Sequence, residues 1–566
     1  MDVLGISAYG TGSGAALVRG GRLIAASSEA HFTRNPAESA LPRRAVRFCL
    51  SAGGIQARDL RAIVLHEKPL RRFERVLAEQ LAAFPRSSRS FSREVFTWLG
   101  DRLWIKSRLA SDLDVDPSQL YFSGRALSFA ASAFFATEFD DAAILVVDGD
   151  GEWATTSFAV ARDSRIELLF EMHHPHSLVL ALRAIAKWLG FGQPGGEALV
   201  EALATLGTAS HAQAMSQFVR VGDAARIELD DRGFVSDLNG GLACGPAWIA
   251  AFGSARHVGD ALLHSSQGSR HADLAASFQA VLADAVLALA RELAQRVSSN
   301  KLCFVGALAN NATIVAKLAE HGPFDEVFVP PWCDESALAI GAAWYGSSSF
   351  EPGVRPTATS GFRFGEAALL EPTLAKVTGC SAEVVVDEYA RVERMAAALR
   401  SGRTVGWVRG RVEYGTDPIE ARLVLADPRR HGIVKHLADS ILRREEFLPF
   451  TAVVASERAE EFFVVPPSLR STIGGRIVSL AATSNARRYA PEWTGSCERF
   501  RVRFVTRAQD AALHSLLSKF GEPMLLAAPL APRSEPVVRG ERDAVSFLER
   551  SALDLLVVED RVYERS

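Results

Sequence analysis

The most informative part of this sequence is Ile144-Leu-Val-Val-Asp-Gly-Asp-Gly-Glu-Trp-Ala-Thr-Thr-Ser-Phe-Ala-Val160. Its first four apolar residues predict a buried strand, Asp148-Gly-Asp-Gly151 predicts a tight turn, and the residues from Ala154 to Val160 predict a returning strand. Glycine at two positions of a turn lets the backbone approach a phosphate closely, and an aspartate at the end of a strand can meet a metal ion. The stretch therefore predicts a strand–turn–strand unit with a ligand site at the turn.

The start of the chain has the same form. Val3-Leu-Gly-Ile-Ser7 predicts a strand, Gly10-Thr-Gly-Ser-Gly14 a glycine-rich turn, and Ala15-Ala-Leu-Val18 the strand that follows. Two such units in one chain predict a duplicated fold. Two ordinary hairpins are the alternative that this pattern alone leaves open.

Composition limits the classes of function. A chain of 566 residues is too long for one core, so two to four domains are expected. The formal net charge of −3 gives no basic footprint for nucleic acid, so none is expected as a partner. We find no charged-then-apolar leader and no apolar run of roughly 18 residues, the length of a membrane span. A cytoplasmic protein without a membrane partner is therefore expected.

Glycine turns and helix starts predict where a nucleotide would bind. Gly306-Ala-Leu-Ala-Asn-Asn311 lies between a predicted strand and a predicted helix, an arrangement that suits anions. Asp334 precedes another predicted helix, where it could hold a metal ion or simply cap the helix. ATP, ADP or magnesium are the candidate ligands, and the predicted nucleotide contacts are Gly149, Asp150, Gly151, Glu152, Gly306, Asn310 and Asn311.

A domain boundary is predicted near residue 350. Residues 347–361 are rich in Ser, Pro, Gly and Thr, as linkers are. The sequence thus predicts a first domain over residues 1–346, a linker over 347–361 and a second α/β domain over 362–566.

Several motifs carry a resemblance to a known family. They are Gly5-Ile-Ser-Ala8, Phe32-Thr-Arg34, Val147-Asp-Gly-Asp-Gly-Glu-Trp-Ala-Thr155, Gly410-Arg-Val-Glu-Tyr-Gly415, Leu425-Ala-Asp-Pro-Arg429 and Glu535-Pro-Val-Val538. In this order they resemble the carbamoyltransferases, the nodulation and antibiotic O-carbamoyltransferases. The resemblance implies an actin-like, sugar-kinase-type N-terminal domain with nucleotide and iron, followed by a YrdC-like C-terminal domain. It also implies that carbamoyl phosphate and ATP give a carbamoyladenylate, whose carbamoyl group passes to a hydroxyl.

The N-terminal site departs from the family pattern. Where the family has Glu-His-His-Leu-Ser-His, this chain has Gly124-Arg-Ala-Leu-Ser-Phe129, so Arg125 and Phe129 replace the iron ligands. Neither side chain can bind iron. Asp148 and Asp334 remain, and they could hold magnesium weakly or Arg125 could form an internal salt bridge. Thr11 and Gly12 stand where the family has His-Asp, which removes the general base.

The C-terminal site departs as well. Asp417, Leu442 and Leu448 replace cations that face phosphates in the family, and Pro529 lies in a run that replaces hydroxyl and amide side chains. Each lost charged hydrogen bond costs roughly 1.5–3 kcal/mol, so carbamoyl phosphate should bind very weakly. The remnants of the carbamoyl site are Arg411, Glu413, Arg422 and Arg444.

These losses favour a non-catalytic member of the family. Its partner would be an active carbamoyltransferase homologue of natural-product biosynthesis, in a homo- or heterodimer. The alternative is a repurposed carbamoyl or acyl transferase that acts on a hydroxyl of a small-molecule pathway intermediate. The first is favoured because the replacements are apolar and supply no new base.

Overall fold

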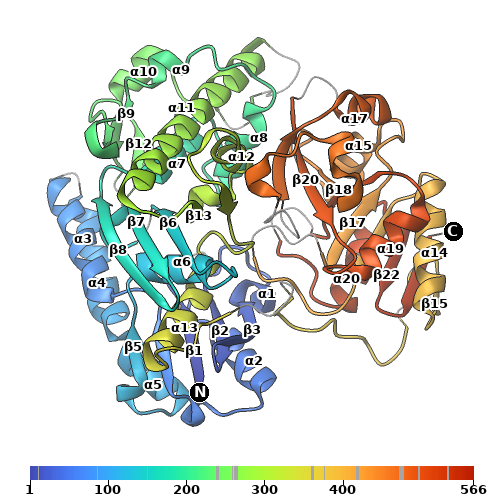
Figure 1. Ribbon diagram of the computed structural model, residues 1–566, viewed down its shortest axis with the longest axis horizontal. Helices are drawn as coiled ribbons and strands as arrows, with labels where there is room; N and C mark the ends of the chain where they lie inside the picture. The colour runs from blue at the N-terminus through green and yellow to red at the C-terminus, as the bar shows by residue number, and fades with distance from the viewer. Residues whose placement is uncertain are drawn as a thin grey trace. The chain divides into compact units, whose positions relative to one another are not determined.

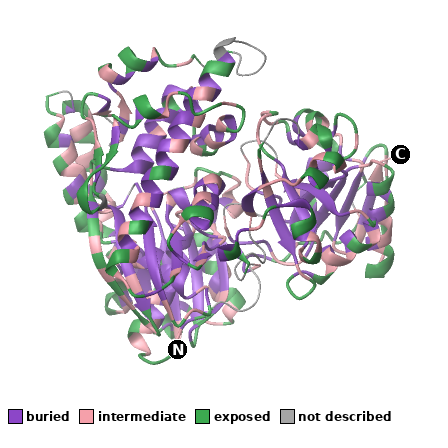
Figure 2. Cartoon of the chain, turned by 45° about the horizontal axis from the view of Figure 1, so that its top comes forward, coloured by how far each residue is buried: buried purple, intermediate pink, exposed green. Residues whose placement is uncertain are grey.

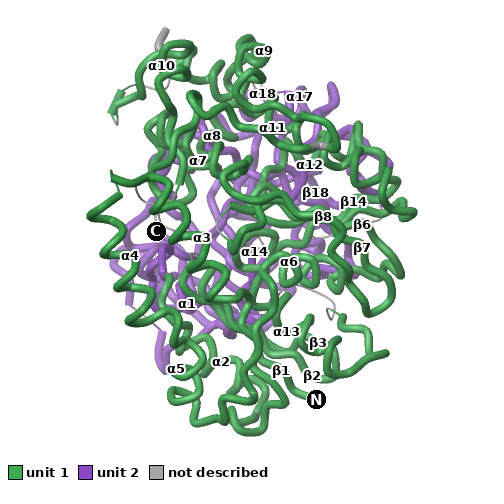
Figure 3. Tube along the Cα trace, turned by 90° about the vertical axis from the view of Figure 1, so that its left-hand side faces the viewer, with its two compact units in different colours: residues 1–25, 39–358 green, residues 26–38, 359–566 purple. Residues whose placement is uncertain are grey.

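The computed structural model describes residues 1–10, 12–85, 87–149, 151–237, 241–257, 259–260, 266–357, 363–374, 376–415, 420–470, 477–494, 498–531 and 535–565 (Figure 1). The chain forms two compact units (Figure 3). Unit 1 comprises Met1–Ala25 and Ser39–Ala358, and unit 2 comprises Ala26–Glu38 and Thr359–Ser566. A short segment near the N-terminus therefore belongs to the unit that is otherwise C-terminal.

Unit 1 contains two five-stranded sheets with the same topology. The first has the order β3-β2-β1-β4-β5, with β1 antiparallel to β2 and parallel to β4. The second has the order β8-β7-β6-β13-β14, with β6 antiparallel to β7 and parallel to β13. The strands are β1 (Asp2–Ser7), β2 (Gly14–Arg19), β3 (Arg22–Ser28), β4 (Ala62–Leu65), β5 (Leu120–Phe122), β6 (Asp141–Val147), β7 (Ala154–Arg162), β8 (Arg165–His173), β13 (Lys301–Val305) and β14 (Glu326–Phe328).

This repeated topology confirms the predicted duplicated fold. Each hairpin predicted from a glycine turn is extended by parallel strands that come from later in the chain, which two ordinary hairpins would lack. Strands β1 and β6 are buried along almost their whole length because each lies inside a sheet (Figure 2). Their apolar runs are the sequence signal of that burial.

Two helices rich in small residues, α6 (Arg125–Phe134) and α13 (Ala337–Phe350), pack against each other, and α13 also packs on β1. Gly341 makes this approach possible, since a Cβ there would lie 1.7 Å from the Ser128 carbonyl oxygen. Helix α13 continues through Phe350, so residues 347–350 are helical and not part of a linker. Burial of Ser347 in the packed helix outweighs a composition that is typical of linkers.

The remaining helices of unit 1 surround the sheets (Figure 1). The longer ones are α2 (Arg43–Gly53), α3 (Pro69–Ala82), α4 (Ser88–Gly100), α5 (Ile105–Leu113), α7 (Leu178–Trp188), α8 (Gly196–Ala204), α11 (Ser266–Arg296) and α12 (Ala312–His321). Helix α11 is long and apolar enough to cross a membrane by length and composition alone, but 78% of its most apolar 18-residue window is buried inside the fold. Such burial is typical of a core helix.

Unit 2 is built on one nine-stranded sheet with the order β15-β23-β22-β16-β17-β21-β18-β20-β19. Helices α14 (Glu388–Arg400) and α19 (Ala511–Phe520) cover one face, and α20 (Glu541–Arg550) with a π-helical turn (Leu437–Leu442) covers the other. The strands are β15 (Cys380–Val384), β16 (Val405–Val408), β17 (Arg422–Ala426), β18 (Thr451–Ala455), β19 (Ile477–Ala481), β20 (Arg499–Val505), β21 (Met524–Pro529), β22 (Leu555–Val558) and β23 (Arg561–Arg565). The predicted second α/β region is confirmed.

The segment Ala26–Glu38 contributes helix α1 (Glu29–Thr33) to unit 2. The Ser27 hydroxyl donates to a Glu366 carboxylate oxygen at 2.9 Å. The Arg34 guanidinium donates to the carbonyl oxygens of Val537 at 2.6 Å and Pro536 at 2.8 Å. These bonds join the segment to residues more than 330 positions later in the chain.

Candidate functional site

Arg125 lies at the start of α6, where the chain leaves β5 through Ser123 and Gly124, and its side chain is buried. Its Nε–H donates to Asp148 Oδ2 at 2.6 Å, and Nη2 lies 3.3 Å from Asp148 Oδ1. Nη2 also donates to Glu335 Oε1 at 3.0 Å. Of the two arrangements left open by the sequence, the structure contains the internal salt bridge.

A third carboxylate, Glu67, approaches the same guanidinium from the end of β4. Its Oε2 lies 3.9 Å from Arg125 Nη1, and its Oε1 accepts a hydrogen bond from Arg72 at 2.7 Å. Burial opposes ionisation of Glu67, but Arg72 and His66 hold its pKa well below the usual range. Burial likewise opposes the charge of Arg125, yet Asp148 and Glu335 raise its pKa well above normal. Glu67 and Arg125 are therefore both ionised at neutral pH.

The residues at the family's iron-ligand positions do not fit an iron ion. Arg125 places a permanent positive charge against Asp148, and Phe129, one turn later, is fully buried with its ring 5.5 Å from the guanidinium carbon. Asp334 instead accepts a hydrogen bond from the Ser336 N–H at 2.9 Å, just before α13. The N-cap of α13 is Ser336, so this bond closes a turn ahead of the helix, and metal binding by Asp334 stays a prediction.

Glu335 is a site residue that the sequence analysis missed. Besides Arg125, it accepts a hydrogen bond from the Gly12 N–H at 3.0 Å. A Cβ at Gly12 would lie 2.4 Å from the Glu335 backbone, so the β1–β2 turn needs glycine there. Thr11 lies outside the described residues. The only sequence signal for Glu335 was its position next to Asp334 ahead of a helix.

The predicted phosphate-binding glycines are packed against protein. A Cβ at Gly149 would lie 2.7 Å from Val179, and one at Gly151 would lie 2.6 Å from Arg125 Cδ. Gly306 has a φ of 106° and faces the Val147 carbonyl oxygen. Close packing and positive φ explain these glycines, and their contact with a nucleotide stays a prediction. Asp150 lies outside the described residues.

Asn310 and Asn311 lie at the start of α12. The Asn311 side chain accepts from the Ile314 N–H at 3.0 Å and exchanges two hydrogen bonds with Gln279. The Asn310 side chain lies 3.9 Å from the Cys333 sulfur. In the structure Asn311 is therefore a helix cap.

A cavity of about 170 Å³ lies beside Arg125. Its polar lining includes Lys68, Arg71, Asp148, Glu152, Thr155 and Glu171. Glu152 accepts a hydrogen bond from the Lys68 N–H at 2.7 Å, and burial, together with Glu67, raises its pKa. Unlike Asp148, Glu152 makes no ion pair within the described part of the chain. Glu152 is therefore a buried carboxylate of this wall whose surroundings favour the protonated form.

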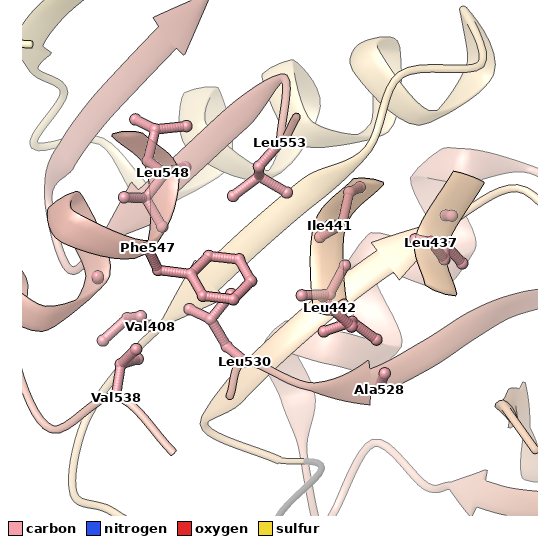
Figure 4. Packing of buried hydrophobic residues seen from close by; sticks show 14 of the residues in the cluster. Val408, Leu437, Ile441, Leu442, Ala528, Leu530, Val538, Phe547, Leu548 and Leu553 are labelled. Carbon is pink, nitrogen blue, oxygen red and sulfur yellow. The ribbon is translucent and has the colours of Figure 1, made fainter. Parts of the chain in front are cut away.

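In unit 2, Leu442 is a core residue. It ends the π-helical turn and packs among Leu437, Leu530 and Phe547 (Figure 4). Leu448 and Pro529 are half-buried, and Pro529 lies in β21 opposite Leu423 of β17. The position where the family has a phosphate-binding lysine is thus filled by apolar packing.

The four residues predicted to remain from the carbamoyl site all contact other residues of unit 2. Arg422 is fully buried and donates to the carbonyl oxygens of Val538 at 3.1 Å and Arg409 at 2.8 Å. Arg411 donates to the Phe364 and Gly365 carbonyls. Glu413 accepts from the Ala421 N–H at 2.9 Å, and Arg444 stacks 4.3 Å from the Phe450 ring centroid. Asp417 lies outside the described residues.

Sequence reasoning also missed a charged cluster in unit 2. Arg409 and Arg363 both contact Asp510, at 2.7 Å and 3.3 Å. Arg503 donates to Glu420 at 2.7 Å. Apart from strand position, nothing in the sequence indicates that these residues meet.

Comparisons with known proteins match most of the chain to carbamoyltransferases. The family models described as carbamoyltransferase N-terminus and C-terminus match residues 2–344 and 396–565. Protein sll1178 of Synechocystis sp. is 29% identical over 600 residues, covering 100% of this chain and 97% of its own. Nodulation protein NolNO of Sinorhizobium fredii is 28% identical over an alignment that covers 96% of this chain and 77% of NolNO. The 3'-hydroxymethylcephem-O-carbamoyltransferase of Amycolatopsis lactamdurans is 27% identical and covers 44% and 46%.

Proposed function

Because this chain belongs to the carbamoyltransferase family, we propose that it is a non-catalytic member, a partner of an active family enzyme in natural-product biosynthesis. It would lack the iron- and ATP-dependent carbamoyl transfer that the family performs. The relatives include nodulation proteins and a cephem O-carbamoyltransferase, which supports a pathway that modifies small molecules.

One observation carries the proposal: the Arg125 guanidinium occupies the acidic centre of unit 1. Its ion pairs with Asp148 and Glu335 neutralise the carboxylate that the family uses for iron. A metal ion would have to displace a buried, doubly paired arginine, at a cost of several kcal/mol. The apolar packing around Leu442 in unit 2 supports the same conclusion for phosphate.

The first test measures the iron content of the protein, its binding of carbamoyl phosphate and its release of pyrophosphate from ATP. Purified protein should contain far less than one iron per chain, give no heat with carbamoyl phosphate, and release no pyrophosphate from ATP. NolNO, treated identically, is the matched comparison. Stoichiometric iron, or carbamoyl phosphate-dependent pyrophosphate release, would show that the proposal is wrong.

The second test restores the histidines. The double variant Arg125→His with Phe129→His places two imidazoles one turn apart, beside Asp148. We expect it to bind Co(II) with a visible absorption band, while the wild type and Phe129→His alone do not. If the wild type binds cobalt equally well, Arg125 does not exclude a metal ion, and the main support for the non-catalytic role is lost.

The cavity favours a second candidate, a repurposed carbamoyl or acyl transferase. Glu152, with its raised pKa, would accept the proton of an acceptor hydroxyl, and Arg125 would stabilise negative charge beside it. Mass spectrometry of hydroxylated small molecules incubated with the protein and an activated acyl or carbamoyl donor would detect transfer. Glu152→Gln should then abolish the activity, whereas Glu171→Gln, at the same cavity, should retain most of it.

A further inference from the structure

Exposed apolar side chains gather on the helix pair α3–α4 and the short turn that follows. Within the described residues they are Leu70, Leu81, Phe84, Phe96, Leu99 and Trp104, and Phe96 is the most exposed of them at 75%. We call this set, with the arginines described below, the α3–α4 surface. Several large apolar side chains exposed on one pair of helices are a feature of interaction sites.

The exposed residues follow the period of a helix. Leu70 and Leu81 are eleven residues apart, three turns of α3, so they share one side. On α4, Arg89, Arg93 and Phe96 recur at intervals of four and three and share another side.

The turn after α4 extends this side. The Trp104 indole N–H donates to the Leu99 carbonyl oxygen at 2.6 Å, which holds the exposed ring beside the end of α4. The surface is therefore ordered by the fold.

The core does not need these side chains. Helix α4 is anchored by Trp98, which is 2% exposed and lies 5.8 Å from the Phe73 ring. Arg102 stacks on Trp98 at 5.2 Å from the opposite end. Phe96 and Leu99 flank Trp98 in sequence but point away from this anchor, as their exposure shows.

The surface is positively charged. Arg71, Arg89 and Arg93 are exposed, and none of them makes an ion pair with any residue that the structure describes. A second copy of this chain on the same surface would bring these cations face to face, which is unfavourable. Charge complementarity therefore requires an acidic occupant.

The α3–α4 surface adjoins the cavity of unit 1. Lys68 and Arg71, at the first turn of α3, line the cavity, and Leu70 between them is 71% exposed. A partner seated on α3 would reach the mouth of the cavity.

We propose that the α3–α4 surface is the docking site for an acidic protein segment, with carboxylates around one or two apolar side chains. This inference rests on the partner role proposed above and names the chemistry of that partner. Phe96 and Trp104 would be the apolar anchors, because aromatic side chains carry much of the energy of such contacts. Arg89 and Arg93 would set orientation and speed association.

The test uses two fluorescently labelled amphipathic peptides of equal length, one of leucine and glutamate and one of leucine and lysine. The full chain should bind the acidic peptide, more weakly as salt rises, and should not bind the basic one. Phe96→Ser with Arg93→Glu should weaken binding at least tenfold. Val386→Ser, at an equally exposed valine of unit 2, is the matched control and should leave binding unchanged.

Two other occupants would overturn the proposal. One is an anionic membrane surface. It would be shown if the chain binds phosphatidylglycerol vesicles but not the acidic peptide, and if the double variant loses vesicle binding. The other is shown by a dimer in sedimentation that the same variant dissociates. The peptide-binding assay does not measure enzymatic turnover, so the two proposals can fail separately. If the chain binds the acidic peptide and also proves catalytically active, the non-catalytic role is wrong and the docking surface is still supported. No binding by an inactive chain would refute the surface alone.

Discussion

At Arg125, one buried guanidinium pairs with two carboxylates. It contacts Asp148 twice and Glu335 once, so one positive charge offsets part of the negative charge of the two carboxylates. Taking ions out of water is costly, and such a cluster is stable only while every member is present. Loss of the arginine would remove the cation beside the buried Asp148 and the partly buried Glu335.

Arg125→Ala should therefore lower the free energy of unfolding by about 3–5 kcal/mol. Arg19→Ala is the control: Arg19 pairs with Asp2 at 2.7 Å, but the arginine side chain is 44% exposed. An exposed pair contributes about 0–1 kcal/mol. Urea denaturation of both variants would test the difference, and equal effects would contradict the account of the buried cluster.

His31 should make unit 2 sensitive to acid. Burial lowers its pKa to about 4, with help from Arg34, Arg422 and Arg539. An unfolded histidine takes up a proton near pH 6.5, so the folded state loses stability as the pH falls from about 6.5 to about 4. Glu366, 4.0 Å away, has a pKa raised by burial and acts in the opposite sense, since it favours the folded state at low pH.

The variant His31→Asn isolates the histidine. Thermal melts at pH 7, 6, 5 and 4 should show a smaller loss of melting temperature for the variant than for the wild type. His257→Asn, at an exposed histidine of unit 1, should leave the profile of the wild type unchanged. Parallel curves for all three proteins would rule out the linkage to His31.

The salt bridge of Arg125 could be predicted because both residues lie in recognisable motifs. Glu67 and Glu335 could not, since they reach Arg125 only when β4, α6 and α13 are assembled. Leu442 was predicted to replace a phosphate-facing lysine of the family, but the sequence does not reveal that its side chain packs into a core. Local patterns predict what a residue is able to do, whereas its neighbours depend on the tertiary fold.

At the scale of elements, glycine and alanine decide how closely α6 and α13 approach. Gly341→Ala would place a methyl group against the Ser128 carbonyl, so the helices must separate. We expect a loss of about 1–3 kcal/mol or more. Gly100→Ala, at the end of α4 where a Cβ meets no atom within 4 Å, should instead stabilise by a few tenths of a kcal/mol, about as helix propensity predicts. Denaturant midpoints of the two variants should move in opposite directions.

Strands and glycine turns were predictable because their apolar runs and turn residues are local. The end of α13 was not. Its last residues have the composition of a linker, but Ser347 is buried, and packing there overrides local preference. The sequence pattern also gave no sign that Ala26–Glu38 belongs to unit 2, because its contacts lie hundreds of residues away.

At the scale of the whole molecule, this segment changes what a cut between the units would do. Residues 351–361 remain the predicted site of first proteolysis. A cut there should give two bands on a denaturing gel but one peak in native size exclusion, because the N-terminal fragment keeps Ser27 and Arg34 bound to unit 2. Ser27→Ala with Arg34→Ala should let the fragments separate, whereas Arg19→Ala should not. Separation of the wild-type fragments would contradict this role of the segment.

The same segment sets an order of events on the ribosome. Arg34 is made 503 residues before Val537, whose carbonyl oxygen it binds. At roughly 5–20 residues per second, that interval is on the order of 25–100 s. Unit 1 can form its own sheets in that time, while Ser27 and Arg34 await the residues of unit 2 that they bind. In the nascent chain, helix α1 therefore lacks its contacts with unit 2 through most of synthesis. These contacts can form only after the residues near Val537 have been translated.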